Sequence, residues 1–104
     1  MEADVKRLDR ICSNLAEVEM GLMNGEINFH YDNLMSAMKA GHPCEIMDSI
    51  LSKIYYPAIS GKEPPMETME ETLAELTEFG EAFAIKEIKQ PLKELAEYIT
   101  LRKS

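Results

Sequence analysis

The sequence is poor in the residues from which metal sites and disulfide frameworks are built. It contains 2 cysteines and 2 histidines in 104 residues. Cys12 and Cys44 are too few for a disulfide framework and lack the close spacing of a zinc-binding pair. Carboxylate-bridged di-iron bundles need paired Glu-x-x-His motifs, and the sequence has none. We therefore expect reduced thiols, no metal site and no cofactor.

Basic residues are also scarce. Lysine and arginine number 11 against 19 acids, which gives a formal net charge of −8, and residues 63–104 hold 10 of those acids. Proteins that bind nucleic acid or an anionic membrane surface need a basic face. A helix-turn-helix reading of residues 27–56 would place Glu45 and Asp48 on the recognition helix, where they would repel phosphate. The charge balance predicts no direct nucleic-acid binding and no membrane binding.

Long apolar segments are missing as well. No run of apolar residues approaches the ~20 that a membrane-spanning helix needs. The opening stretch, MEADVKRLDR, is charged throughout and does not resemble a signal peptide. These features predict a cytoplasmic protein. A chain of 104 residues is expected to form a single domain with one modest core.

What the sequence does have is apolar residues at helical spacing, without strand-like alternation. Helices are expected over residues 3–23, ending at Asn24-Gly25, over 27–40, over 43–56 and over a long stretch from Met66. Residues 60–65, SGKEPP, read as a linker. Pro57 should close or kink the third helix, and Pro91 should kink the last one or restart it near Gln90.

These elements predict an all-α fold, a small antiparallel bundle of four to five helices in the order long, short, short, long. The first and fourth helices are expected to be the longest. Because shorter helices cannot cover their full length, an apolar strip should remain at the surface. We therefore expect a homo-oligomer, preferably a dimer, or a complex with a protein partner.

The segment AGHPCEIM raises the question of a reactive site. Gly41 fits the end of one helix, Pro43 the first position of the next, and Glu45 the acid-favouring first turn. A helix boundary therefore explains most of the segment, and we prefer that interpretation. The rival hypothesis is a reactive thiol: at a helix N-terminus and beside His42, Cys44 would have a lowered pKa.

The helix after the linker has two contrasting faces. Its acidic face comprises Glu67, Glu70, Glu71, Glu75 and Glu78, and its apolar stripe comprises Met66, Met69, Leu73, Leu76 and Phe83. Such a helix is expected to dock on a protein partner through the apolar residues, with the glutamates at the rim. In a narrower hypothesis, the acidic face occupies a basic surface of that partner, including one meant for nucleic acid, and so regulates it.

Paired glutamates also suggest an enzyme. Glu67 with Glu70, Glu75 with Glu78, Glu78 with Glu81, and Glu94 with Glu97 each place two carboxylates one helical turn apart, an arrangement that holds Mg²⁺. The pattern resembles that of the all-α nucleotide pyrophosphohydrolases, although their second pair ends in Asp. The resemblance implies Mg²⁺-dependent cleavage of a nucleoside triphosphate. A solvated helix face explains the same glutamates, so a non-catalytic interaction or assembly module is the preferred prediction.

Overall fold

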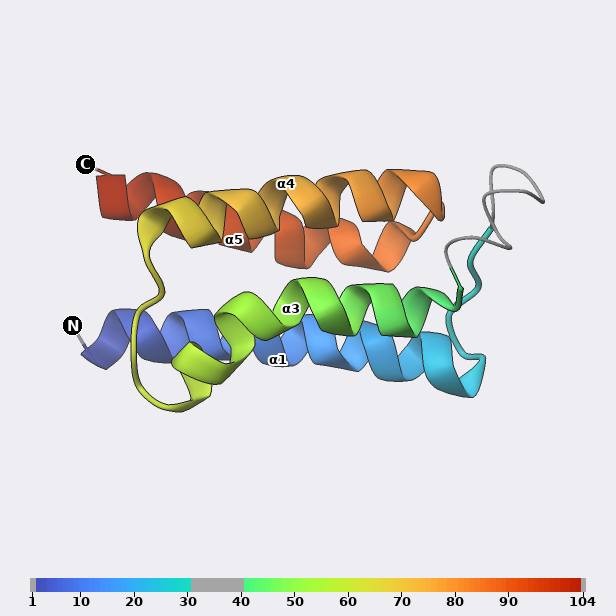
Figure 1. The fold of residues 1–104 in the computed structure, drawn as a ribbon, viewed down its shortest axis with the longest axis horizontal. Helices are drawn as coiled ribbons and strands as arrows, with labels where there is room; N and C mark the ends of the chain where they lie inside the picture. Colours follow the sequence, from blue (N-terminus) through green and yellow to red (C-terminus); the bar gives the residue numbers. More distant parts are fainter. Residues whose placement is uncertain (1, 31–40, 104) are drawn as a thin grey trace.

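The computed structural model describes residues 2–30 and 41–103 (Figure 1). Its elements are α1 (Glu2–Asn24), α3 (Pro43–Ile59), α4 (Met66–Ala82), the short 3₁₀ helix η1 (Lys86–Ile88) and α5 (Lys89–Lys103). The described residues contain no strand. The predicted all-α class is therefore confirmed.

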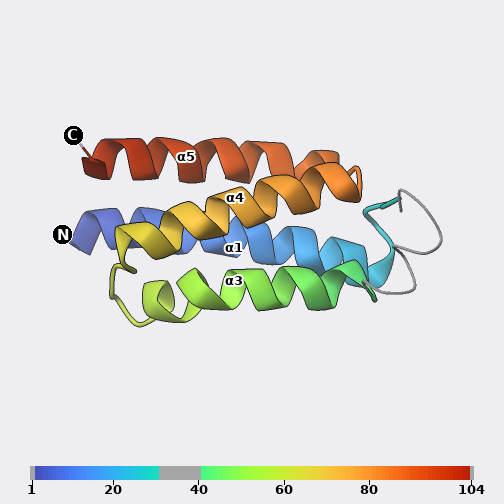
Figure 2. The same cartoon turned by 45° about the horizontal axis from the view of Figure 1, so that its top comes forward.

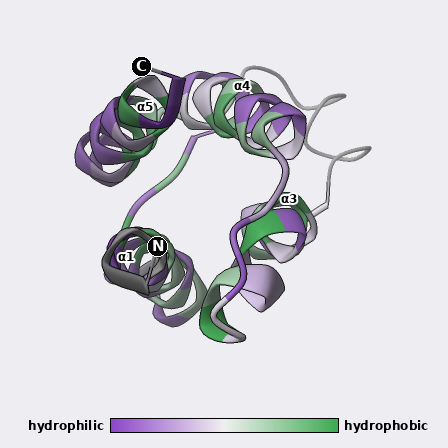
Figure 3. Cartoon of the chain, turned by 90° about the vertical axis from the view of Figure 1, so that its left-hand side faces the viewer, coloured by the Kyte–Doolittle hydropathy of each residue, from purple (hydrophilic) through white to green (hydrophobic). Residues whose placement is uncertain are grey.

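Within the described residues, four α-helices form an antiparallel bundle (Figures 1 and 2). Viewed along the bundle axis, they occupy the corners of a square (Figure 3). α1 packs against α3 and α5, and α4 packs against the same two helices. This is the up-and-down arrangement that short connections favour. The start of α1 and the end of α5 lie at the same end of the bundle.

One apolar stripe from each helix fills the interior. The most deeply buried side chains are Leu8, Ile11 and Leu15 of α1, Met47 and Ile54 of α3, Met69 and Leu76 of α4, and Leu95 and Tyr98 of α5. Steps of three and four residues keep each stripe on one side of its helix. Burying a side chain of this size stabilises the fold by roughly 1.5–3 kcal/mol. The periodicity that predicted the helices is thus also what holds them together.

The prediction for residues 27–40 is wrong at its start. α1 ends at Asn24 as expected, and Gly25 follows with φ +81°. The chain is then non-helical up to residue 30: the Ile27 N–H donates to the Gly21 carbonyl at 2.9 Å, and the His30 N–H donates to the Phe83 carbonyl at 2.9 Å. These bonds to other elements replace helical ones. Residues 31–40 lie outside the described part of the chain.

α3 continues further than expected. It reaches Ile59, although Pro57 lies inside it and leaves one carbonyl without its helical donor. The last turn departs from the axis of the preceding turns (Figures 1 and 3). Of the two predicted effects of Pro57, a bend is therefore present, whereas an end to the helix is not.

α4 is shorter than expected. It has 17 residues, as α3 does, whereas α1 has 23. The expected long, short, short, long order is therefore wrong in its fourth helix. α4 stops because Ala84 adopts a positive φ of 53°, which lets the Ile85 N–H close back on the Gly80 carbonyl at 2.9 Å. α5 then begins at Lys89, so the predicted restart near Gln90 is confirmed.

The predicted linker is present and is tied to the bundle. Residues 60–65 are non-helical and connect α3 to α4. Glu63 in the middle of this linker accepts a hydrogen bond from Arg102 Nη2 at 2.6 Å and another from the Tyr98 hydroxyl at 3.3 Å. The linker is therefore hydrogen-bonded to α5, although α4 and η1 lie between the two in the sequence.

Candidate functional site

The His42–Cys44 segment forms a helix N-terminus. His42 is the N-cap of α3, and its Nδ1 accepts a hydrogen bond from the Cys44 backbone N–H at 3.1 Å. Pro43 is the first residue of the helix. The Cys44 side chain is turned inward, where its Sγ donates to the Glu19 carbonyl at 3.4 Å. The favoured boundary interpretation thus explains His42 as well, which the sequence had left without a role.

The surroundings of the Cys44 thiol oppose its ionisation. Burial raises its pKa, and the nearby carboxylates of Glu19 and Glu45 raise it further. The backbone hydrogen bond at Cys44 acts in the opposite direction and is outweighed. The raised pKa argues against the hypothesis of a reactive Cys44, because the helix N-terminus that would favour the thiolate lies against a buried and acidic surrounding.

We expect Cys44 to react with iodoacetamide more slowly than free cysteine at neutral pH, as followed by intact mass. Cys12 provides the control, since burial and Asp9 raise its pKa to about 12. Both thiols should react together once urea unfolds the chain. Alkylation of folded Cys44 at the rate of free cysteine would contradict the prediction.

The two buried thiols also predict a pH dependence of stability. Because the pKa values of Cys12 and Cys44 in the folded chain are raised above 9.0, the free energy of unfolding should fall as pH rises past that value, where the thiols of the unfolded chain lose their protons first.

The paired glutamates do not converge on one site. Glu75 of α4 pairs with Lys53 of α3 at 3.0 Å, whereas Glu97 of α5 pairs with Arg7 of α1 at 3.7 Å. Glu75 and Glu97, which belong to pairs on different helices, are thus directed toward different neighbouring helices. No group of three or more His, Cys, Asp or Glu side chains among the described residues is placed to hold a metal ion. The geometry gives the nucleotide hydrolase alternative no support.

The acidic face lies where the sequence placed it. Glu67, Glu70, Glu71 and Glu78 are exposed, and Glu75 is half-buried. Glu70 is engaged by Lys103 at 3.3 Å and Glu75 by Lys53. The face is therefore exposed to solvent and is partly neutralised at Glu70 and Glu75 by lysines of neighbouring helices.

The apolar stripe of α4 mostly serves the core of this chain. Met69, Leu76 and Phe83 are 1 %, 0 % and 7 % exposed, so an external partner would not meet them. Met66 and Leu73 are half-buried. Leu73 is the member of the stripe that borders a hollow at the surface between α4 and α5.

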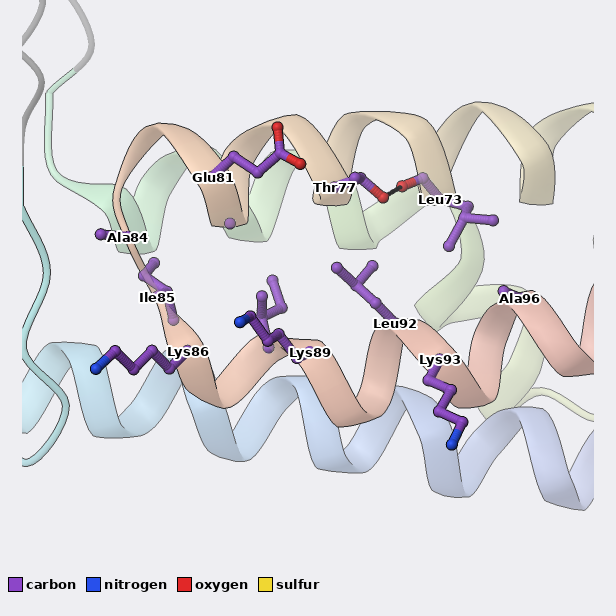
Figure 4. Close-up of a pocket in the computed structure, with 12 residues that line it drawn as sticks. Leu73, Thr77, Glu81, Ala84, Ile85, Lys86, Lys89, Leu92, Lys93 and Ala96 are labelled. Atoms are coloured by element: carbon purple, nitrogen blue, oxygen red, sulfur yellow. Dashed lines mark hydrogen bonds between the residues drawn. The ribbon is translucent and has the colours of Figure 1, made fainter.

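That hollow, here called the α4–α5 groove, has a volume of about 590 Å³ (Figure 4). Its lining residues are Leu73, Thr77, Gly80, Glu81, Ala84, Ile85, Lys86, Ile88, Lys89, Leu92, Lys93 and Ala96. Gly80 and Ala96 add little or no side chain, and Leu73 and Leu92 form apolar walls. Ala96 lies on α5 beside Leu73 of α4, and its small side chain helps to leave the groove open (Figure 4).

The two edges of the α4–α5 groove differ in charge. Along the α5 side lie three exposed lysines, Lys86, Lys89 and Lys93. Along the α4 side lie Thr77 and Glu81, both exposed (Figure 4). None of the three lysines forms an ion pair with a described residue, whereas Arg102 and Lys103 further along α5 do. The structure thus leaves a basic edge without a partner on an acidic protein.

Sequence reasoning missed this groove. Its signal was a spacing of three and four residues between the lysines, next to Leu92 and Ala96. The total charge of residues 63–104 concealed this local cluster.

The described part of the chain holds no helix that combines the length and the apolar character needed to cross a bilayer. In comparisons with protein-family models, curated proteins and solved structures, none matched the chain.

Proposed function

We propose that this protein is a non-catalytic interaction or assembly module whose binding surface is the α4–α5 groove. The observation that carries the proposal is an open apolar hollow of about 590 Å³ with edges of opposite charge. Apolar anchors in such a hollow supply binding energy, while charged edges select the partner and set its orientation.

The form of the groove favours an elongated occupant. Two antiparallel helices border it along their length (Figure 4). An amphipathic helix lying along such a groove inserts apolar residues spaced at i, i+3 or i+4, and i+7. Its flanking charged residues would then meet the lysines on one side and Glu81 on the other.

The same lining argues against nucleotide hydrolysis. Among the described residues that border the groove, Glu81 supplies the one carboxylate. Mg²⁺ in nucleotide-cleaving sites is held by carboxylates together with substrate phosphates, and in two-metal sites by more of them. An interaction surface therefore accounts for the groove better than an active site does.

The proposal is tested by photo-cross-linking. A photoreactive phenylalanine analogue replaces Thr77, which is exposed at the groove edge, and in a control chain it replaces Ser13, which is exposed on α1. We expect one discrete protein adduct from position 77 in the source cells and none from position 13. The mass of the adduct identifies the partner as another copy or as a different protein. Adduct patterns that are the same at both positions, or no adduct at all, would refute the proposal.

A further inference from the structure

We infer that the α4–α5 groove binds the same groove of a second copy, in a symmetric dimer whose two-fold axis runs parallel to the helices. This inference rests on the proposed function, because it names the partner of the same surface. It is carried by the opposite charges of the two groove edges, which make the surface complementary to itself.

The positions of the charged residues along the length of the groove agree with this symmetry. α4 and α5 run in opposite directions and border the groove together. Glu81 on the α4 edge and Lys89 on the α5 edge lie at similar levels along it (Figure 4). A two-fold axis parallel to the helices leaves the position of each residue along the helix direction unchanged. It brings the α4 edge of one copy opposite the α5 edge of the other. Glu81 of one copy then faces Lys89 of the other, and the contact occurs twice.

The alternative symmetry is unfavourable. A two-fold axis across the helices would place α5 over α5 and bring the three lysines of one copy toward those of the other. Like charges held close together oppose association. The charge distribution therefore selects the axis parallel to the helices.

A second copy also fits better than a foreign acidic helix. An acidic helix would satisfy the lysine edge but would be repelled by Glu81 on the opposite edge. Only a partner with one acidic and one basic side satisfies both edges, and this chain is such a partner. Leu73, Leu92 and Ala96, which are half-buried in one copy, would then be covered by their counterparts.

The net charge of −8 on each copy sets a further condition. Two such chains repel each other at long range, but at physiological salt this repulsion is screened beyond about 8 Å. Close pairs across the groove are screened less. Association should therefore depend on the local match of the edges and fail when that match is broken.

The test is a charge exchange measured by sedimentation equilibrium and native mass spectrometry on the full chain. The wild-type protein should dimerise. Lys89→Glu and Glu81→Lys should each raise the dimer dissociation constant about tenfold or more, the change that ~1.4 kcal/mol produces. Each single variant turns both opposite-charge contacts into like-charge contacts. A mixture of the two variants in equal amounts should recover a heterodimer, because both contacts again join opposite charges.

The control is Lys6→Glu, which makes the same charge change at an exposed position of α1 outside the groove and should leave the dissociation constant unchanged. Circular dichroism melts verify that each variant is folded. A wild-type monomer at all concentrations, or a dimer that is insensitive to both single variants, would overturn the inference. If Thr77 then cross-links a different protein, the proposed function stands while the dimer falls. If no specific adduct forms either, both fall.

Discussion

Replacing Leu76 with alanine is expected to lower the free energy of unfolding by ~2–5 kcal/mol. Leu76 is 0 % exposed and contributes to the core shared by the four helices. The substitution removes apolar contacts and leaves a cavity that the surrounding helices fill only in part. Since small domains have ~5–15 kcal/mol of stability in all, the loss should shift a urea denaturation curve far to lower concentration.

Leu101→Ala is the matched control. It is the same chemical change at a side chain that is 59 % exposed, and it should alter stability by no more than about 0.5 kcal/mol. The comparison also separates folding from docking, because the sequence had assigned Leu76 to a partner-binding stripe. Equal and small effects of the two substitutions would contradict the placement of Leu76 in the core.

Gly80→Ala is expected to destabilise the fold by ~1–3 kcal/mol, the usual cost of overpacking. In an ordinary helix this change would stabilise by about 1 kcal/mol. Here, a Cβ on residue 80 would lie 2.6 Å from Cγ2 of Ile88. That methyl is bonded directly to the Cβ of a side chain only 1 % exposed, so it cannot rotate away without disturbing the core. Overpacking should therefore outweigh helix propensity.

Ile88→Leu provides the test of this cause, because leucine lacks the Cγ2 methyl. The double variant should recover part of the stability lost in Gly80→Ala, so that the two effects are not additive in urea denaturation. Gly21→Ala is a useful comparison: its Cβ would lie 2.5 Å from Cδ1 and 2.7 Å from Cγ1 of Ile27, but this side chain is half-buried and has more room to change its rotamer than Ile88 has. Strict additivity at positions 80 and 88 would show that their contact is not the cause.

Helix positions could be predicted largely from apolar periodicity, and helix ends only in part. The Asn24-Gly25 stop was visible because glycine readily adopts the positive φ that ends a helix. The end of α4 was not, because Ala84 adopts a conformation that alanine normally avoids. Likewise, the non-helical residues 27–30 form hydrogen bonds to Gly21 and Phe83, which no local pattern reports.

The candidate site could be predicted less well than the fold. An amphipathic pattern shows that one side of a helix is buried, but not whether its own chain or a partner buries it. Met69, Leu76 and Phe83 were therefore assigned to docking although they fill the core. The α4–α5 groove is lined by residues of two helices, and a hollow made by two elements has no signal in either one alone.

The order of helix contacts bears on how fast the chain can fold. α1 packs on α3, α3 on α4 and α4 on α5, and each of these contacts joins described helices that follow one another along the sequence. Among the described elements, the packing of α1 on α5 and on η1 joins segments from the two ends of the sequence. Most of the bundle can therefore assemble as two helical hairpins, one on either side of the linker. The chain between α1 and α5 is closed into a loop only once, when these two helices pack, and the entropic cost of that closure is modest. Such local connectivity is typical of proteins that fold within microseconds to milliseconds.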